Sequence, residues 1–261
     1  MGSMRHGTAM TFLIVGIGMM VMVGAPQALR AATEDATAHF NRGVELLEKG
    51  DLDGAISEYR TAIQINPKDT DVHYGLGVIL RRKGDLDGAI AEYRTAIGLK
   101  PNHVDAHNNL GVALGRTGDL DGAIAEYRTA IGLNPDQADA HYNLGAALQE
   151  KKDVDGAIAE FRTAIRLNPN DAEAHRTLGD TLMGKGDLDG AVGAYRTVIR
   201  LHPNDAETHY NLMVALMQQK NVSAAAKELE EFTRLATDTA ANRQLIDAAK
   251  KRLNQLSGPE K

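Results

Sequence analysis

One histidine recurs at intervals of 34 residues along this chain, at the equivalent position each time. The six residues are His39, His73, His107, His141, His175 and His209. Imidazole is a common metal ligand, so a periodic series of histidines first raises the question of a zinc site. Zinc needs its ligands at about 2 Å, whereas neighbouring helices are spaced roughly 8–10 Å apart. We therefore interpret the histidines as packing residues and expect no metal ion and no cofactor.

A second repeated feature is the acidic element Asp-x-Asp-Gly, which occurs five times and begins at Asp51 in its first copy. It looks like the start of a calcium-binding loop. It lacks the third oxygen ligand and the closing glutamate that such a loop requires. Acidic residues at the start of a helix are sufficiently explained by capping and by the helix dipole. We therefore expect helix caps at these positions.

Motifs for catalysis are absent from the sequence. It has no cysteine, which removes thiolate chemistry and disulfides. It also lacks the nucleophile elbow, the phosphate-binding loop, the zinc-protease motif and the dinucleotide fingerprint. The net charge of −6 gives no electrostatic reason to expect a nucleic acid. The sequence therefore predicts a protein that is not an enzyme.

These residues are positioned by a strict internal repeat. The string Gly-Asp-Leu-Asp-Gly-Ala-Ile begins at Gly50, Gly84 and Gly118, and related strings follow at 152, 186 and 220, so the period is 34 residues. Such a period predicts a solenoid of stacked units. Apolar residues at spacings of three and four predict two helices per unit, the first ended by a left-handed glycine such as Gly118 and the second by a proline such as Pro135. Aromatic residues are expected to recur at one position of the second helices and to be the large core anchors: Tyr59, Tyr93, Tyr127, Phe161, Tyr195 and Phe232.

The repeat resembles the tetratricopeptide family, whose pattern is W-x₂-L-G-x₂-Y…A-x₃-F…P in 34 residues. The fourth copy carries it as His141-x₂-Leu144-Gly145-x₂-Leu148, followed by Ala157-x₃-Phe161 and Pro169. Two departures are histidine in place of the tryptophan, and glycine in the first turn of five second helices, where glutamate is frequent. That glycine forgoes a capping box and predicts a weaker start of the helix.

The resemblance implies an all-α, right-handed superhelical solenoid of helix-turn-helix repeats. We place six repeats in residues 36–239 (36–69, 70–103, 104–137, 138–171, 172–205 and 206–239), a capping helix at 240–256 and a tail at 257–261. In this family the first helices line a concave groove that binds protein segments. The resemblance therefore implies a protein or peptide partner.

Asparagine and tyrosine recur on the first helices at the positions that would face that groove. The asparagine row is similar to the ladder by which the repeat array of O-linked N-acetylglucosamine transferase holds peptide backbone. An amide side chain can both donate to and accept from a backbone. Gly75 and Thr177 interrupt the row, and packing or solubility is an equal alternative explanation of it. The predicted groove residues are Asn41, Tyr74, Asn109, Tyr142, Asn143, Tyr210 and Asn211, with Arg82 and Arg116 on one rim and Asp71, Asp105, Asp139, Glu173 and Glu207 near the other.

The N-terminus, residues 1–35, has a separate character. No charged side chain lies between Gly7 and Leu29, Arg5 precedes this stretch, and small residues follow. The pattern predicts either a secretory signal, cleaved after Ala28 or Ala31, or a retained membrane anchor. Either alternative implies export, to the periplasm or to the periplasmic face of the inner membrane, with no membrane contact beyond this segment.

Together these features predict a non-catalytic scaffold or adaptor outside the cytoplasm, which binds an extended segment of a partner protein. Two alternatives stay open from the sequence. One is an assembly factor for a pilus, a secretion machine or a polysaccharide machine. The other is a structural protein whose copies assemble with one another as a homo-oligomer.

Overall fold

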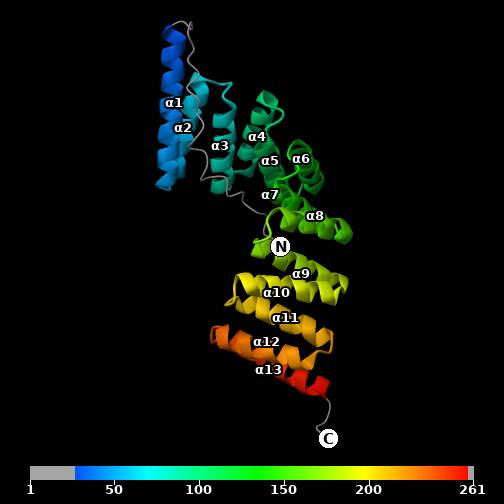
Figure 1. Cartoon of the computed structure of the whole chain (residues 1–261). Helices are drawn as coiled ribbons and strands as arrows, with labels where there is room; N and C mark the ends of the chain where they lie inside the picture. Colours follow the sequence, from blue (N-terminus) through cyan, green and yellow to red (C-terminus); the bar gives the residue numbers. More distant parts are fainter. Residues whose placement is uncertain (1–26, 258–261) are drawn as a thin grey trace. The chain divides into compact units, whose positions relative to one another are not determined.

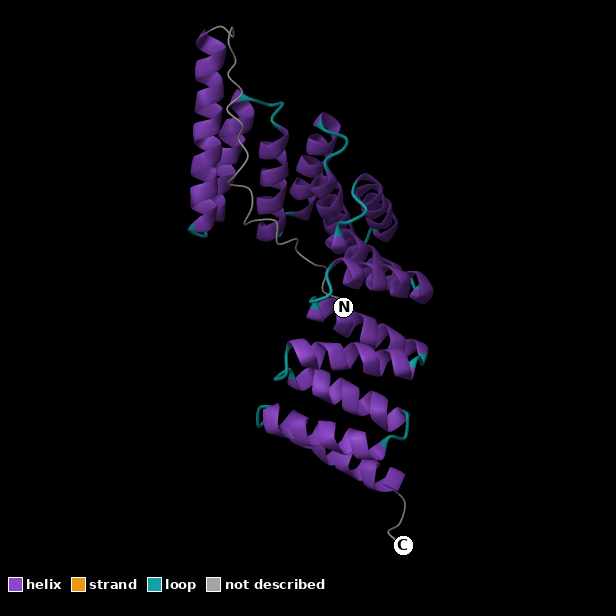
Figure 2. Cartoon of the chain, in the orientation of Figure 1, coloured by secondary structure: helices purple, strands orange, loops and turns teal. Residues whose placement is uncertain are grey.

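The computed structural model describes residues 27–257, and this part of the chain folds into thirteen α-helices without a strand (Figures 1 and 2). The chain is an all-α repeat solenoid in which consecutive helices pack as antiparallel pairs. It divides into two compact units, with the division after Ala147. We call the described residues before the division the N-terminal unit and those after it the C-terminal unit. Residues 1–26 of the predicted signal or anchor lie outside the described residues.

The helices alternate between first and second helices of the repeats. The first helices are α1 (Gln27–Glu48), α3 (Thr70–Lys83), α5 (Val104–Thr117), α7 (Ala138–Glu150), α9 (Ala172–Lys185) and α11 (Ala206–Gln218). The second helices are α2 (Leu52–Ile65), α4 (Leu86–Leu99), α6 (Leu120–Leu133), α8 (Val154–Leu167), α10 (Leu188–Leu201) and α12 (Val222–Leu235). A last helix, α13 (Ala240–Ser257), packs against α12 through the buried side chains of Ala249 and Leu253. No helix within residues 27–257 combines the length and the apolar character needed to cross a membrane.

An aspartate caps the start of each of the second helices α2, α4, α6, α8 and α10. In α6 the Asp119 carboxylate accepts a hydrogen bond from the backbone N–H of Gly122 at 2.9 Å. This bond confirms the caps that the sequence predicted at the Asp-x-Asp-Gly elements. A Cβ added to the equivalent Gly156 would lie 2.6 Å from the carboxylate of its capping residue, Asp153. The glycine therefore makes room for the cap.

The turn between the two helices of a repeat passes through a left-handed residue. Gly118 has a φ of +90° there, as the sequence predicted. Lys152 and Lys220 occupy the same position in the fourth and sixth repeats, and they keep the left-handed conformation with φ values of +66° and +60°. A side chain in this conformation costs roughly 1–2 kcal/mol. The turn geometry is therefore imposed by the helix pair and does not depend on glycine.

The core of each repeat is built on contact between a glycine of the first helix and an aromatic ring of the second. In the third repeat, a Cβ added to Gly111 would lie only 2.7 Å from Cε1 of Tyr127, so the fully buried ring lies directly against the backbone of α5. Gly77 with Tyr93 and Gly179 with Tyr195 repeat the arrangement. Burial raises the pKa of the Tyr93 hydroxyl to about 12.

The sixth repeat corrects one predicted core position. The residue 34 positions after Tyr195 is Leu229, whereas Phe232 lies three residues later, where the fifth repeat has Val198. Both Leu229 and Phe232 are buried. Met213 replaces the glycine of the first helix and is fully buried. This repeat therefore exchanges a glycine and a large ring for two side chains of middle size, which conserves volume.

Candidate functional site

The periodic histidines His73, His107 and His209 lie between the two helices of their own repeats. Nδ1 of His107 is 2.6 Å from a carboxylate oxygen of Glu126, on the second helix of the repeat, and Nε2 is 2.9 Å from the carbonyl oxygen of Pro101. His73 and His209 repeat both contacts with their own glutamates and prolines. In these three repeats both ring nitrogens are therefore engaged within the protein, which fits the packing interpretation. Within residues 27–257, His175 contacts only the carbonyl oxygen of Pro169, because Ala194 stands where those repeats have glutamate. No cluster of three or more potential metal ligands occurs in the described residues.

Two asparagines of the predicted groove row are buried and hold neighbouring repeats together. The amide of Asn109 donates to the Tyr74 hydroxyl at 3.0 Å and to the Asp105 carbonyl at 2.9 Å. The amide of Asn143 donates to the Asn108 side chain at 3.1 Å and is fully buried. These groups are already satisfied, so the structure supplies no free amide ladder at these two positions. The packing alternative describes both residues better.

The other predicted groove residues differ in their accessibility. Tyr142 is buried, with 1% of its surface exposed. Tyr74 is half-buried, and its ring centroid lies 4.8 Å from that of His103. In the C-terminal unit, Tyr210 and Asn211 are half-buried, and the ring of Tyr210 contacts Phe232 at 5.2 Å. Asn41 is exposed on α1.

Arg82 and Arg116 are the predicted residues best placed to meet a partner. Both are exposed near the C-terminal ends of α3 and α5, at equivalent positions of adjacent repeats. Neither forms an ion pair or a side-chain hydrogen bond within the described part of the chain. Of the acids predicted for the other rim, Asp105 accepts from Gln137 at 2.9 Å and Glu207 from Arg176 at 2.8 Å. The first helices of the N-terminal unit therefore present two available cations.

Asp180, on α9, is a residue of this face that the sequence reasoning missed. Its position is occupied by Val112 in the third repeat and by Val214 in the sixth, so an acid at an otherwise apolar position was the signal available. One carboxylate oxygen of Asp180 accepts a hydrogen bond from the Tyr195 hydroxyl at 2.7 Å and one from the Asn211 amide at 3.4 Å. Loss of surrounding water raises the pKa of the Asp180 carboxyl above its usual range, against the opposing effects of the Tyr195 hydrogen bond and of Arg176.

Asp180→Asn should stabilise the protein at pH 7. A raised pKa in the folded state means that the carboxyl favours folding below its unfolded pKa and loses that contribution as the pH rises through the folded value. Asparagine removes the ionised group and keeps an oxygen for Tyr195. Because the residue is exposed, we expect a gain of less than about 1 kcal/mol, shrinking towards zero near pH 3.5. Urea unfolding at both pH values measures it. The control is Asp247→Asn, an exposed aspartate of α13, and a net loss at pH 7 would contradict the expectation.

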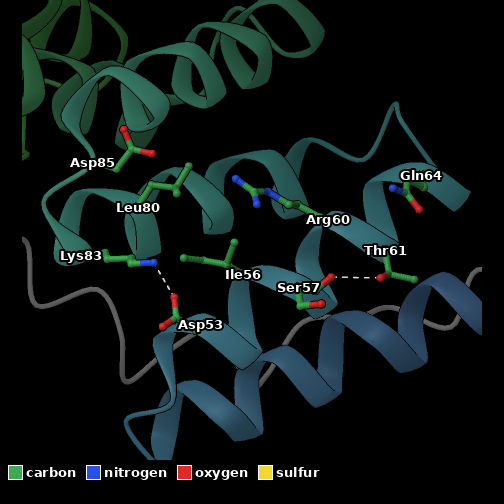
Figure 3. Close-up of a pocket in the computed structure, with 9 residues that line it drawn as sticks. All are labelled: Asp53, Ile56, Ser57, Arg60, Thr61, Gln64, Leu80, Lys83 and Asp85. Atoms are coloured by element: carbon green, nitrogen blue, oxygen red, sulfur yellow. Dashed lines mark hydrogen bonds and ion pairs between the residues drawn. The ribbon is translucent and has the colours of Figure 1, made fainter.

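Two cavities of the described residues include none of the predicted groove residues. One of about 470 Å³ lies between α2 and α3, where Arg60, Thr61 and Gln64 line one side (Figure 3). Lys83 and Asp53 form an ion pair across it. A second cavity, of about 530 Å³, is formed by Gly186 to Asp189 with Gln219 and Asn221. Both are open and polar, and neither gathers the groups that catalysis requires.

Comparison with known proteins identifies the repeat. A family model described as "Tetratricopeptide repeat" matches residues 108–172 and 176–240, and one described as "TPR repeat" matches 43–84 and 77–118. The search of curated proteins found no match. Among solved structures, MamA is 28% identical, with 63% of this chain and 96% of that chain covered and a TM-score of 0.59.

Two further structures support the fold alone, because their identities are below 25%. YrrB, described as "a TPR protein with an unusual peptide-binding site", is 24% identical, with coverage of 74% of this chain and 97% of that one and a TM-score of 0.63. PilF from Pseudomonas aeruginosa is 22% identical, with coverage of 84% and 99% and a TM-score of 0.70.

Proposed function

Because this chain belongs to the tetratricopeptide repeat family, we propose that it is a non-catalytic adaptor that holds an extended segment of another protein against its first helices. The observation that carries the proposal is a pair of exposed arginines, Arg82 and Arg116, at equivalent positions of α3 and α5, which have no ion-pair partner among residues 27–257. Two cations one repeat apart match a segment that runs across the helices and carries acidic groups or carbonyl oxygens. Exposed side chains at equivalent positions of adjacent repeats suit binding, whereas the buried asparagines serve packing.

A matched pair of variants tests which face binds. Arg82→Ala/Arg116→Ala removes the two cations from first helices, and Arg94→Ala/Arg128→Ala removes two exposed arginines from the second helices α4 and α6. Both variants make the same change of composition in the same unit. The full chain in mild detergent is cross-linked in an envelope extract, purified, and the captured proteins are quantified by mass spectrometry.

We expect the wild-type chain and the Arg94/Arg128 variant to capture equal amounts of a partner protein. The Arg82/Arg116 variant should capture about tenfold less of it, which corresponds to a loss of about 1.4 kcal/mol in binding free energy. Loss in the Arg94/Arg128 variant alone would move the site to the second helices and overturn the proposal. Capture of the chain by its own copies, unaffected by either change, would favour the self-assembling alternative.

The N-terminal segment supports an extension of the proposal: the adaptor acts outside the cytoplasm. The uncharged stretch from Gly7 to Leu29 lies between Arg5 and Arg30, and Glu34 and Asp35 follow. A basic residue before a long apolar stretch is typical of an export or anchoring segment. Fractionation of the producing cells before the pull-down tests this location. An intact chain in the membrane fraction indicates an anchor, and a chain shortened to begin after Ala28 or Ala31 indicates a cleaved signal. An intact chain confined to the cytosol would overturn the proposed location.

A further inference from the structure

The acid at position 180 breaks the pattern of the first helices. The equivalent positions in the other repeats are apolar in every case: Val44, Val78, Val112, Ala146 and Val214. An acid replaces a small apolar side chain only in the fifth repeat, on α9. Asp180 is exposed, so it does not serve to fill the core of its repeat. Contact with a specific group of a binding partner therefore explains the acid at position 180 better than packing does.

The protein holds this carboxylate in one orientation. Its Oδ1 atom accepts from the Tyr195 hydroxyl at 2.7 Å, and Tyr195 itself is fixed because only 1% of its surface is exposed. The Asn211 amide, on α11, reaches the same oxygen at 3.4 Å. The Oδ2 atom has no hydrogen-bond or ion-pair partner in the described part of the chain. One oxygen is therefore anchored, and the other is left to accept from outside.

The charges around Asp180 leave its carboxylate without a paired cation. Arg176, the cation whose charge acts on Asp180, donates from Nη1 to Glu207 at 2.8 Å, so its charge is balanced by another carboxylate. Glu207 adds negative potential at Asp180, and Tyr195 and Asn211 are neutral donors. No ammonium or guanidinium group of the described chain is paired with Asp180. A cation from a partner would complete the site.

The surface beside the carboxylate suits the stem of a long side chain. Met183 and Gly184 follow Asp180 by three and four residues, which places them on the same face of α9. On α11, Val214 and Met217 occupy the positions equivalent to Asp180 and Met183 of α9. These three apolar side chains are half-buried, and a Cβ added to Gly184 would meet no atom within 4 Å. Lysine and arginine combine an apolar stem with a charged head in the way this surface requires.

We propose that Asp180 recognises a lysine or arginine side chain of the segment that this protein binds. The inference rests on the proposed function, because it assumes that a segment of another protein lies along the first helices. It adds the chemistry of one contact: the cation donates to Oδ2 of Asp180, and its methylene groups lie over Met183 and Met217. The C-terminal unit thereby selects for a basic residue in its partner.

Selection from a random peptide library tests this contact. Phage displaying random 12-residue peptides are selected on the full chain in detergent and, in parallel, on the Asp180→Lys variant. The best wild-type binder is synthesised with a fluorescent label, together with versions in which its basic residue is replaced by norleucine or by glutamate. Fluorescence anisotropy then gives Kd values for the wild type, Asp180→Asn, Asp180→Lys and the control Asp247→Asn.

We expect lysine and arginine to be enriched on the wild type, and glutamate or aspartate on Asp180→Lys. Asp180→Asn, which keeps the acceptor for Tyr195, should weaken the basic peptide by about tenfold and leave the norleucine peptide unchanged. The glutamate peptide should bind Asp180→Lys better than it binds the wild type. Asp247→Asn should bind every peptide as the wild type does, and circular dichroism verifies that all variants are folded.

The outcomes separate the two proposals. Peptides that bind the wild type without enrichment of basic residues, and with affinities that Asp180→Asn leaves unchanged, would overturn the role of Asp180 while the adaptor function stands. If no peptide is enriched on any variant, and the envelope pull-down also captures nothing, both proposals fail. Charge-swapped binding by Asp180→Lys supports the contact directly, because a purely structural role of Asp180 cannot produce it.

Discussion

Tyr127→Ala should lower the free energy of unfolding by about 3–5 kcal/mol, the range for deletion of a buried aromatic side chain. The ring is fully buried and lies directly against the backbone of α5 at Gly111. Gly111 has no side chain that could refill this space. The large loss of stability is expected because the Tyr127 ring alone fills the space between α6 and the backbone of α5 at Gly111.

Chemical denaturation of the full chain, followed by circular dichroism, measures this loss. Thr129→Ala is the matched control, since Thr129 is exposed on the same helix and bonds only to the carbonyl of Ala125. We expect the control to change stability by less than about 0.5 kcal/mol. A loss under about 1 kcal/mol for Tyr127→Ala would show that the aromatic ring is not the anchor of the repeat.

Gly111→Met should be the second strongly destabilising change, with a loss of about 3 kcal/mol or more. A Cβ at this position would lie 2.7 Å from Cε1 of the Tyr127 ring and 3.1 Å from the carbonyl oxygen of Ala123, so the added side chain forces the two helices apart. The sixth repeat shows how the same fold accepts a methionine there. Met213 and Leu229 are both buried where the third repeat has Gly111 and Tyr127.

The double variant Gly111→Met/Tyr127→Leu copies that natural solution. We expect it to be more stable than the sum of the two single losses predicts, by at least about 1 kcal/mol of coupling. The four proteins of this cycle are compared by urea unfolding under one condition. Additive losses would mean that the sixth repeat depends on other changes, such as Phe232, to accommodate its methionine.

The sequence was sufficient for the helices because the 34-residue period, the capping aspartates and the left-handed turns repeat local rules that need no distant partner. The expected left-handed Gly118 and the core position of Tyr127 are both confirmed. The position of Phe232 was misjudged because an aromatic residue was assigned by type, although the period placed Leu229 there. In the sixth repeat, Met213 and Leu229 fill the core in place of a glycine and an aromatic ring, so the volume is kept although the residue types change.

The candidate site was harder to predict, because a polar side chain on a first helix can either bond to the neighbouring repeat or face a binding partner. Asn109 and Asn143 find hydrogen-bond partners one repeat earlier in the chain, at Tyr74 and Asn108. Composition cannot distinguish that arrangement from a free amide facing a partner. Asp180 escaped notice for the opposite reason: its importance appears only when the residues at one position of all repeats are compared. The exported location and the peptide-binding role of the groove residues stay predictions.

The identical sequences of α4 and α6 have a consequence for how this chain can change its length. Both helices read Leu-Asp-Gly-Ala-Ile-Ala-Glu-Tyr-Arg-Thr-Ala-Ile-Gly-Leu, and both follow Gly-Asp. Deletion of residues 86–119 would therefore pair α3 with a copy of its own second helix and carry the chain on into α7. Recombination between the two coding stretches gives this product in one event, and the reverse event adds a repeat. Selection can then change the length of the binding surface by whole repeats, because the interface between α3 and its second helix keeps the same residues on the second helix.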